Sequence, residues 1–283
     1  MPHTQVNGIE LFHESIGDGP PLLLIHGLGS SGDDWAFQRD AFARAHRVIL
    51  VDLRGSGRSA KPPGPYAIAQ FAADLWALLD AIGIESTHVV GFSLGGSVAL
   101  EMALAQPQRV HRLILCNALA DYRTNTWRKW LEAYAQLALV RAIGVRATSR
   151  LIARRMFPRA DQLPMRRRVV DVVGANPKRA YVATINALIG WSALERLGDV
   201  ACDTLIVAAE HDYTPLAQRQ AEARLFPRAQ LRVIDGSRHG TPFDAIETFN
   251  ACVLEFLGAP ASAPRPSPRD VGAVGAEEAP CVG

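Results

Sequence analysis

Short runs dominated by apolar residues recur along this chain, and each is only four or five residues long. Unbroken runs of this length are typical of strands buried on both faces of a parallel sheet, whereas alternating runs are typical of half-buried strands. Five runs fit this description, at residues 21–25, 48–51, 88–91, 113–116 and 205–208. Two further short segments flank Asn7-Gly8, and this dipeptide between such segments predicts a β-hairpin at the amino end.

Segments with helical periodicity lie between these runs. In residues 68–82, for example, one stripe is formed by Phe71, Leu75, Leu78 and Leu79. Four other helices are expected, at residues 33–45, 95–106, 216–225 and 242–257. Because strands and helices alternate, the sequence predicts an α/β fold with a mostly parallel central sheet flanked by helices.

The alternation breaks between residues 122 and 196, where several helical segments follow one another without a good strand. We interpret residues 122–196 as an inserted helical lid, and residues 1–121 and 197–257 as the core that carries it. Residues 258–283 are rich in Pro, Ala and Gly and contain few large apolar side chains, which predicts a disordered tail.

Charge is distributed unevenly, although the whole chain has a net charge of only +2. The predicted lid contains 15 Lys and Arg residues and 4 Asp and Glu residues, a net charge of +11, so the rest of the chain carries −9. A basic lid could attract an anionic substrate, an acidic partner or a membrane surface, or it could be an ordinary solvated helix face. No recognised nucleic-acid-binding motif accompanies the basic residues, so nucleic acid is not an expected partner.

Composition is that of a folded protein, with 48% hydrophobic and 20% charged residues. No stretch is long and apolar enough for a membrane span, and the first residues lack the features of a signal peptide. We therefore expect a cytoplasmic protein without stable membrane insertion. The four cysteines are far apart and form no Cys-x-x-Cys pair, which argues against a zinc knuckle or a disulfide framework.

The candidate chemistry begins at Gly91-Phe92-Ser93-Leu94-Gly95, where a buried strand gives way to a helix. A Gly-x-Ser-x-Gly match alone is weak evidence, because an incidental glycine-rich turn also produces it. At a strand-turn-helix junction it predicts a nucleophile elbow, in which small residues on both sides let the chain fold sharply and expose the Ser93 hydroxyl. The amino end of the following helix would also favour negative charge on a substrate oxygen.

A serine nucleophile needs a base to remove its proton and a carboxylate to orient that base. His239 is the best candidate base, because it lies in a loop after an expected strand, at the sheet edge where ligands of open α/β proteins bind. Asp212 follows the strand at 205–208 and is the best candidate acid. Glu210 is its nearest competitor, and Asp121 is a weaker substitute.

The negative charge that develops during acyl transfer needs hydrogen-bond donors, which together form an oxyanion hole. One donor should be the backbone N–H of Leu94, directly after the nucleophile. The second should come from the glycine-rich turn at residues 26–29, and we choose the N–H of Leu28. A plain glycine-rich turn would explain the same residues nearly as well.

In combination these features resemble the α/β-hydrolase superfamily, in its small lidded branch of carboxylesterases and enol-lactonases. The turn at residues 26–29 is similar to the family's oxyanion turn, and residues 91–96 are similar to its elbow. Asp212 and His239 match its acid and base positions, in the family's chain order of serine, acid and histidine. Residues 52–59 are similar to a family loop that usually organises turns beside the site without joining the chemistry.

The resemblance implies a serine hydrolase that cleaves an ester or lactone of a small, largely apolar carboxylic acid through an acyl-enzyme, with no metal or organic cofactor. Ser93 argues against the dehalogenase and epoxide-hydrolase relatives, which have aspartate at the elbow, and the lack of an elbow tryptophan argues against prolyl iminopeptidases. Phe92 and Trp35 are candidate substrate contacts that could equally be core residues, and Trp127 is a candidate from the lid.

Two alternatives stay open. The first is a carbon–carbon bond hydrolase, or a cofactor-free perhydrolase or haloperoxidase, that uses the same three residues. The second is a small-molecule receptor that keeps the fold. The sequence does not decide the oligomeric state.

Overall fold

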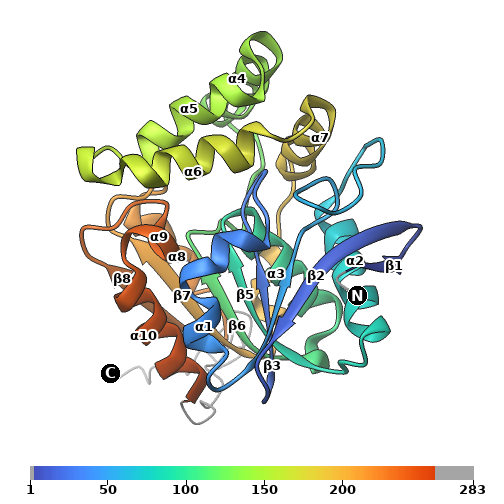
Figure 1. Ribbon diagram of the computed structural model, residues 1–283. Helices are drawn as coiled ribbons and strands as arrows, with labels where there is room; N and C mark the ends of the chain where they lie inside the picture. Colours follow the sequence, from blue (N-terminus) through green and yellow to red (C-terminus); the bar gives the residue numbers. More distant parts are fainter. Residues whose placement is uncertain (1–2, 259–283) are drawn as a thin grey trace, which may run out of the picture.

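The computed structural model describes residues 3–258 of the 283-residue chain. Its centre is an eight-stranded sheet with the order β1-β2-β4-β3-β5-β6-β7-β8 (Figure 1). The strands are β1 His3–Val6, β2 Ile9–Ile16, β3 Pro21–Ile25, β4 Arg47–Val51, β5 Thr87–Phe92, β6 Val110–Cys116, β7 Asp203–Ala209 and β8 Ala229–Ile234. Strands β3 to β8 run parallel, whereas β1 and β2 pair antiparallel at one side. The prediction of a mostly parallel central sheet is confirmed.

Strands β1 and β2 form the hairpin predicted from Asn7-Gly8. Asn7 and Gly8 have φ angles of 48° and 75°, and two consecutive positive φ values are what a type I′ turn requires. Val6 pairs with Ile9 across this turn. The hairpin continues onto β4, so the parallel part of the sheet ends in two antiparallel strands.

Helices flank the sheet close to where periodicity predicts them. Those outside the predicted lid are α1 Arg39–Phe42, α2 Ile68–Ala81, α3 Leu94–Ala105, α8 Leu216–Ala223, α9 Thr241–Asp244 and α10 Ile246–Gly258, with 3-10 turns η1 Gly32–Phe37 and η2 Pro107–Arg109. A further 3-10 turn, η4 Leu194–Asp199, spans the end of the predicted lid. Two expected helices are divided in the structure. Residues 33–45 form η1 and α1, and the fully buried Gln38 between them donates a hydrogen bond to the Pro242 carbonyl. Residues 242–257 break at Ala245, whose φ of −137° is not helical.

The parallel strands are buried on both faces, as their unbroken apolar runs predict. In β3, Leu23 and Ile25 belong to one hydrophobic core, and Leu22 and Leu24 belong to the other. Helices α2 and α3 contribute to the first core, and α1 and α10 contribute to the second. Because successive side chains of a strand point to opposite faces, a strand covered on both sides needs an apolar residue at every position.

Four helices fill most of the segment predicted to be a lid. They are α4 Trp127–Ile143, α5 Val145–Met156, α6 Leu163–Gly174 and α7 Lys178–Leu188, with the 3-10 turn η3 Ala160–Gln162 before α6. This helical insertion, residues 127–188, lies over one edge of the sheet, at the top of the view in Figure 1. A β-bridge between Asp121 and Ser192 joins the two chain segments at its base.

The division of the chain into core, lid and tail stays a prediction. Of the predicted tail at 258–283, Gly258 is the last residue of α10, and the others lie outside the described residues. Within residues 3–258, no helix combines the length and the apolar character needed to cross a membrane.

Candidate active site

The predicted nucleophile elbow is the sharp turn between β5 and α3. Ser93 is the single residue between the two elements, with φ 53° and ψ −119°. A positive φ is uncommon for a residue with a side chain, and backbone strain of this kind clusters at functional sites. The turn requires glycine on both sides, because a Cβ at Gly91 would meet the carbonyl oxygen of Gly95, and a Cβ at Gly95 would meet that of Ile25.

We expect Gly95→Ala to destabilise the protein and distort the elbow. The added methyl group would collide with the backbone of β3, which cannot move without disturbing the central sheet. Overpacking of this kind costs about 1–3 kcal/mol in the free energy of unfolding, which urea denaturation measures. Gly198→Ala is the matched control, because nothing lies within 4 Å of the Cβ position at Gly198. Equal midpoints for the two variants would contradict the packing argument.

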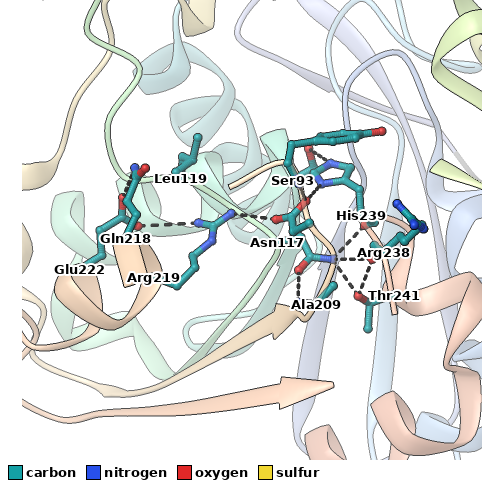
Figure 2. A network of polar contacts seen from close by, with 12 residues as sticks. Ser93, Asn117, Leu119, Ala209, Gln218, Arg219, Glu222, Arg238, His239 and Thr241 are labelled. Carbon is teal, nitrogen blue, oxygen red and sulfur yellow. Dashed lines mark hydrogen bonds and ion pairs between the residues drawn. The ribbon is translucent and has the colours of Figure 1, made fainter. Parts of the chain in front are cut away.

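Ser93, His239 and Asp212 lie just after the ends of three strands and meet at one edge of the sheet, where Figure 2 labels Ser93 and His239. Ser93 Oγ lies 3.0 Å from His239 Nε2, and Asp212 Oδ1 lies 2.6 Å from His239 Nδ1. Ser93 follows β5, Asp212 follows β7 and His239 follows β8, and these parallel strands are neighbours through β6. The structure therefore brings the three sequence candidates within hydrogen-bond distance of one another.

Hydrogen-bond partners define the protonation pattern of His239. An ionised carboxylate can only accept hydrogen bonds, so the Nδ1–H of His239 donates to Asp212, and Nε2 accepts from the Ser93 hydroxyl. The His239 ring stacks on Tyr213 with centroids 4.6 Å apart and contacts Phe92 at 5.5 Å. With a side chain that is 15% exposed, His239 can exchange a proton with a bound molecule while the two rings hold its orientation.

Asp212 is enclosed by partners, and its side chain is only 1% exposed. Burial alone would raise the pKa of this carboxyl group, but the hydrogen bond and charge of His239, together with the charge of Arg219, hold the pKa below its ordinary value. The Tyr213 N–H donates to Oδ1 at 2.7 Å, and Arg219 Nη2 donates to Oδ2 at 3.2 Å. Asp212 is therefore ionised at neutral pH, and both of its oxygens are held.

Asn117 links the chain segments that carry Asp212 and His239, although the sequence analysis does not single it out. It follows β6 with a φ of 48°. Its amide group donates to the His239 carbonyl at 2.8 Å and to Thr241 Oγ1 at 2.7 Å, and its oxygen accepts the Ala209 N–H at 2.9 Å (Figure 2). One side chain thus ties the end of β7 to the loop of His239. A lone asparagine after a strand gives no motif by which this role could be predicted.

The turn after β3 lies beside Ser93, where the sequence predicts an oxyanion hole. A Cβ at Gly27 would lie 3.5 Å from the Ser93 Cβ. Buried His26 supports the turn: its Nδ1–H donates to the Gly27 carbonyl at 2.7 Å, and its Nε2 accepts a backbone N–H from the loop after β4 at 3.0 Å. Leu94 is the first residue of α3, where backbone N–H groups have no acceptor within the helix. The N–H groups of Leu28 and Leu94 stay the predicted oxyanion donors.

The loop at residues 52–59 organises turns beside the site. Asp52 is fully buried and accepts the N–H of Gly32 and the N–H of Arg58, each at 2.7 Å. Arg58 Nε also donates to it at 2.8 Å. Asp52 therefore connects its own loop to the segment after β3, and no residue of 52–59 lines the cavity over Ser93.

A cavity of about 840 Å³ opens over Ser93 and His239, between the core and the helical insertion. Most of its wall is apolar and includes Leu119, Leu139, Ile152, Met156, Val169 and Val173. Asp34 and Arg168 add charged groups to this wall. Burial raises the pKa of Asp34 to about 7, although a hydrogen bond from Ser30 and the charge of Arg168 act in the opposite direction. The sequence analysis does not identify either residue, since neither lies in a motif.

The three aromatic residues predicted to contact substrate lie in different environments. Phe92 lines the cavity. Trp35 is fully buried in the core and stacks on Phe249 with centroids 6.3 Å apart, so its prediction as a substrate contact is wrong. Trp127 is 78% exposed and is not part of the cavity wall, because α4 contributes Leu139 and its neighbours instead. The cavity wall does not include Trp127, and its contact with substrate stays a prediction.

The two competing acids have other partners. Glu210 Oε2 accepts the N–H of Gly236 at 2.8 Å, and Asp121 pairs with Arg123 at 2.8 Å. Neither contacts His239 through a hydrogen bond in the part of the chain that is described. Over residues 3–258, no group of three or more His, Cys, Asp and Glu side chains is arranged to hold a metal ion.

The fold and the Ser93–His239–Asp212 geometry together define a class of hydrolases, and comparison with known proteins agrees. A family model described as the alpha/beta hydrolase fold matches residues 20–245. The chain therefore belongs to the α/β-hydrolase family.

Proteins similar to this chain are named for several kinds of substrate. "Putative carbamate hydrolase RutD" of Azorhizobium caulinodans is 31% identical over 264 residues, which are 91% of this chain and 98% of that protein. The enol-lactonase from Burkholderia xenovorans LB400 has a TM-score of 0.83 at 26% identity, with 91% of this chain and 100% of that chain covered. A thermophilic esterase from Thermogutta terrifontis has a TM-score of 0.79 at 28% identity, with 90% and 96% covered. These similarities fix the family, and the substrate has to be argued from the site.

Proposed function

We propose that this protein is a serine hydrolase that cleaves an ester or lactone of a small, largely apolar carboxylic acid through an acyl-enzyme. The observation that carries the proposal is the hydrogen-bonded series in which Ser93 Oγ lies 3.0 Å from His239 and His239 lies 2.6 Å from Asp212. A serine hydroxyl bonded to a base, which is itself held by a buried carboxylate, is the arrangement needed for nucleophilic acyl transfer.

In the acylation step, Ser93 Oγ attacks the substrate carbonyl carbon while its proton passes to His239 Nε2. Asp212 stabilises the imidazolium that forms and keeps its Nδ1–H oriented. The N–H groups of Leu94 and Leu28 bind the oxyanion of the tetrahedral intermediate. The bond to the leaving oxygen then breaks, and His239 returns the proton to the departing alcohol, or to the ring-opened hydroxyl of a lactone.

In the deacylation step, a water molecule attacks the acyl-enzyme carbonyl and gives a proton to His239. The bond between the acyl carbon and Ser93 Oγ breaks, the carboxylic acid leaves, and His239 returns the proton to Ser93. Each turnover therefore consumes one water molecule and leaves the three side chains as they began.

The wall of the cavity supports a small, largely apolar acyl group. Its volume of about 840 Å³ lies within the usual range for small-molecule sites, and most of the lining side chains are aliphatic or aromatic. The enol-lactonase and esterase relatives are named for the same kinds of bond. An ester or a lactone is therefore the first substrate class to test.

A carbamate is the second candidate, and the relatives favour it. The 31% identical protein from Azorhizobium caulinodans is named as a carbamate hydrolase, and it matches 91% of this chain. A carbamate presents the same carbonyl geometry to Ser93, and the Asp34 carboxyl group in the cavity wall offers an oxygen that can accept from its N–H. The chemistry at Ser93 and His239 would be unchanged.

The proposal is tested with the wild-type protein and a panel of substrates. The panel contains p-nitrophenyl esters from acetate to octanoate, an enol-lactone, an aryl carbamate, a vinylogous diketone, and a carboxylic acid supplied with peroxide. Labelling by a serine-reactive phosphonate, followed by peptide mass spectrometry, identifies the nucleophile independently of the substrate.

We expect labelling at Ser93 and fastest turnover of short esters or lactones. Fastest turnover of the carbamate would support the second candidate. Labelling with turnover only of the diketone or the peroxide mixture would move the assignment to a carbon–carbon hydrolase or a perhydrolase. A folded protein with neither labelling nor turnover would reject the hydrolase proposal in favour of a receptor.

A further inference from the structure

Arg219 is a charged residue in an enclosed position next to the catalytic acid. Its side chain is only 2% exposed, although arginine is among the residues least often buried. It lies on α8 between two carboxylates, with Nη2 3.2 Å from Asp212 Oδ2 and Nη1 3.6 Å from Glu222 Oε2 (Figure 2). Arg219 also contributes to the wall of the cavity that holds Ser93 and His239.

The contacts of Arg219 are poorly suited to stabilising the folded protein. Its Nε and Nη1 atoms are buried without a hydrogen-bond partner among the described residues. Leaving such donors unsatisfied costs free energy, and well-packed apolar residues often stabilise a protein as well as a buried ion pair does. Within residues 3–258, the shorter contact of the guanidinium is the 3.2 Å hydrogen bond to Asp212, whereas Glu222 lies 3.6 Å away, so a role at the active site explains its position better.

Asp212 divides its two oxygens between the base and this guanidinium. Oδ1 accepts from His239 at 2.6 Å and from the Tyr213 N–H at 2.7 Å, whereas Oδ2 accepts from Arg219 at 3.2 Å. Rotation of the carboxylate would break contacts on both sides at once. The positive charge of Arg219 also offsets part of the negative charge that Asp212 presents to His239.

We infer that Arg219 is a positioning residue for the reaction, which fixes Asp212 through Oδ2 and thereby holds the carboxylate in the orientation in which Oδ1 accepts from His239. This inference rests on the proposed serine-hydrolase function. A single buried guanidinium thus sets the orientation of the catalytic acid, and its charge acts on the same group.

The direction of the pH effect follows from charge. A cation near an imidazole disfavours the protonated ring, and a carboxylate whose charge is partly offset stabilises that ring less. Without Arg219, activity should therefore be lost at a higher pH as the solution is acidified. The other titratable or charged groups around His239 and Asp212 are Cys116, Tyr122, Arg155, Tyr213, Arg238 and Asp244. They are the same in wild type and in variants at position 219, so the comparison isolates Arg219.

The experiment measures kcat/KM and the rate of phosphonate labelling of Ser93 across pH. Arg219→Met and Arg219→Gln remove the charge, and Arg219→Lys keeps it. Arg224→Met is the matched control, because Arg224 is an exposed arginine at the end of the same helix. Glu222→Gln removes a negative charge that faces Arg219. Thermal melting identifies the variants that are folded.

We expect the acid limb of both profiles to move up by about one pH unit in the Met and Gln variants, so that activity one unit below the wild-type midpoint falls about tenfold. The Lys variant should bring the midpoint back, and the Arg224→Met profile should match wild type. Glu222→Gln should move the midpoint in the opposite direction, because Arg219 then acts on Asp212 with less competition.

A profile that is lowered uniformly, with no change in its midpoint, would mean that Arg219 is only structural and would overturn the inference. If neither neutral variant folds, an unmoved midpoint in Glu222→Gln would overturn it equally. If the wild-type protein is neither labelled nor active, the proposed function and the inference are both rejected. If the wild-type protein is labelled but the midpoints of the variants do not move, only the inference is rejected.

Discussion

Ser93→Ala is expected to abolish hydrolysis of the best ester, with kcat falling by ~10⁵-fold or more. In the proposed mechanism the acyl-enzyme forms on the Ser93 hydroxyl, which donates its hydrogen bond to His239 Nε2 at 3.0 Å. No other hydroxyl bonded to that nitrogen is found among the residues described, so no neighbour can replace it. Steady-state kinetics and phosphonate labelling should both lose their signal in this variant.

The matched control for this variant is Ser97→Ala. Ser97 lies on the same helix, α3, and its hydroxyl donates to the Leu119 carbonyl at 3.1 Å rather than to His239. We expect the Ser97 variant to be labelled and to keep its activity within about tenfold of wild type, since loss of a single hydrogen bond costs only about 1 kcal/mol. Substantial hydrolysis by a folded Ser93→Ala protein would show that the nucleophile has been assigned wrongly.

Asp212→Asn is expected to lower kcat by ~10⁴-fold at neutral pH while leaving the fold intact. The amide has one acceptor where the carboxylate has two. If its oxygen faces Arg219, its NH2 faces His239 Nδ1 and selects the tautomer in which Nε2 carries the proton and cannot accept from Ser93. If its oxygen faces His239 instead, its NH2 opposes the Arg219 N–H groups. Neither arrangement stabilises the imidazolium that forms during acylation.

Glu210→Gln is the matched control for this change of a carboxylate to an amide. Glu210 lies two residues before Asp212, and its side chain is 47% exposed and bonded to Gly236 rather than to His239. We expect kinetics within a few-fold of wild type for Glu210→Gln. Comparable losses in the two variants would leave the identity of the catalytic acid undecided between them and would refute the assignment to Asp212 alone.

Local patterns predict the sharp turn at Ser93 well because the elbow is a local structure. The glycines at 91 and 95 are needed for close backbone contacts within a few residues of the strand and across to β3, and the alternation of apolar strand and helix locates the turn. The hairpin at Asn7-Gly8 is predicted for the same reason, since both residues adopt the positive φ that their types tolerate. In these cases the residue type itself limits the backbone.

Contacts between distant segments could not be predicted in this way. Trp35 lies soon after the oxyanion turn and is a reasonable candidate from the sequence, but its ring packs on Phe249, more than two hundred residues later. Asn117 donates a hydrogen bond to the His239 carbonyl, and Arg219 donates one to Asp212. Neither residue belongs to a motif. Their roles depend on which strands become neighbours.

The sequence by itself determined the α/β architecture, the position of the elbow and the candidate residues Ser93, Asp212 and His239, because strand burial and tight turns are governed by residues close together in the chain. Only the tertiary structure decided that Asp212, rather than Glu210, meets His239, and that Arg219 holds the far side of its carboxylate. The physical reason is that these contacts span β5, β7, β8 and α8, whose relative positions come from packing of the whole sheet.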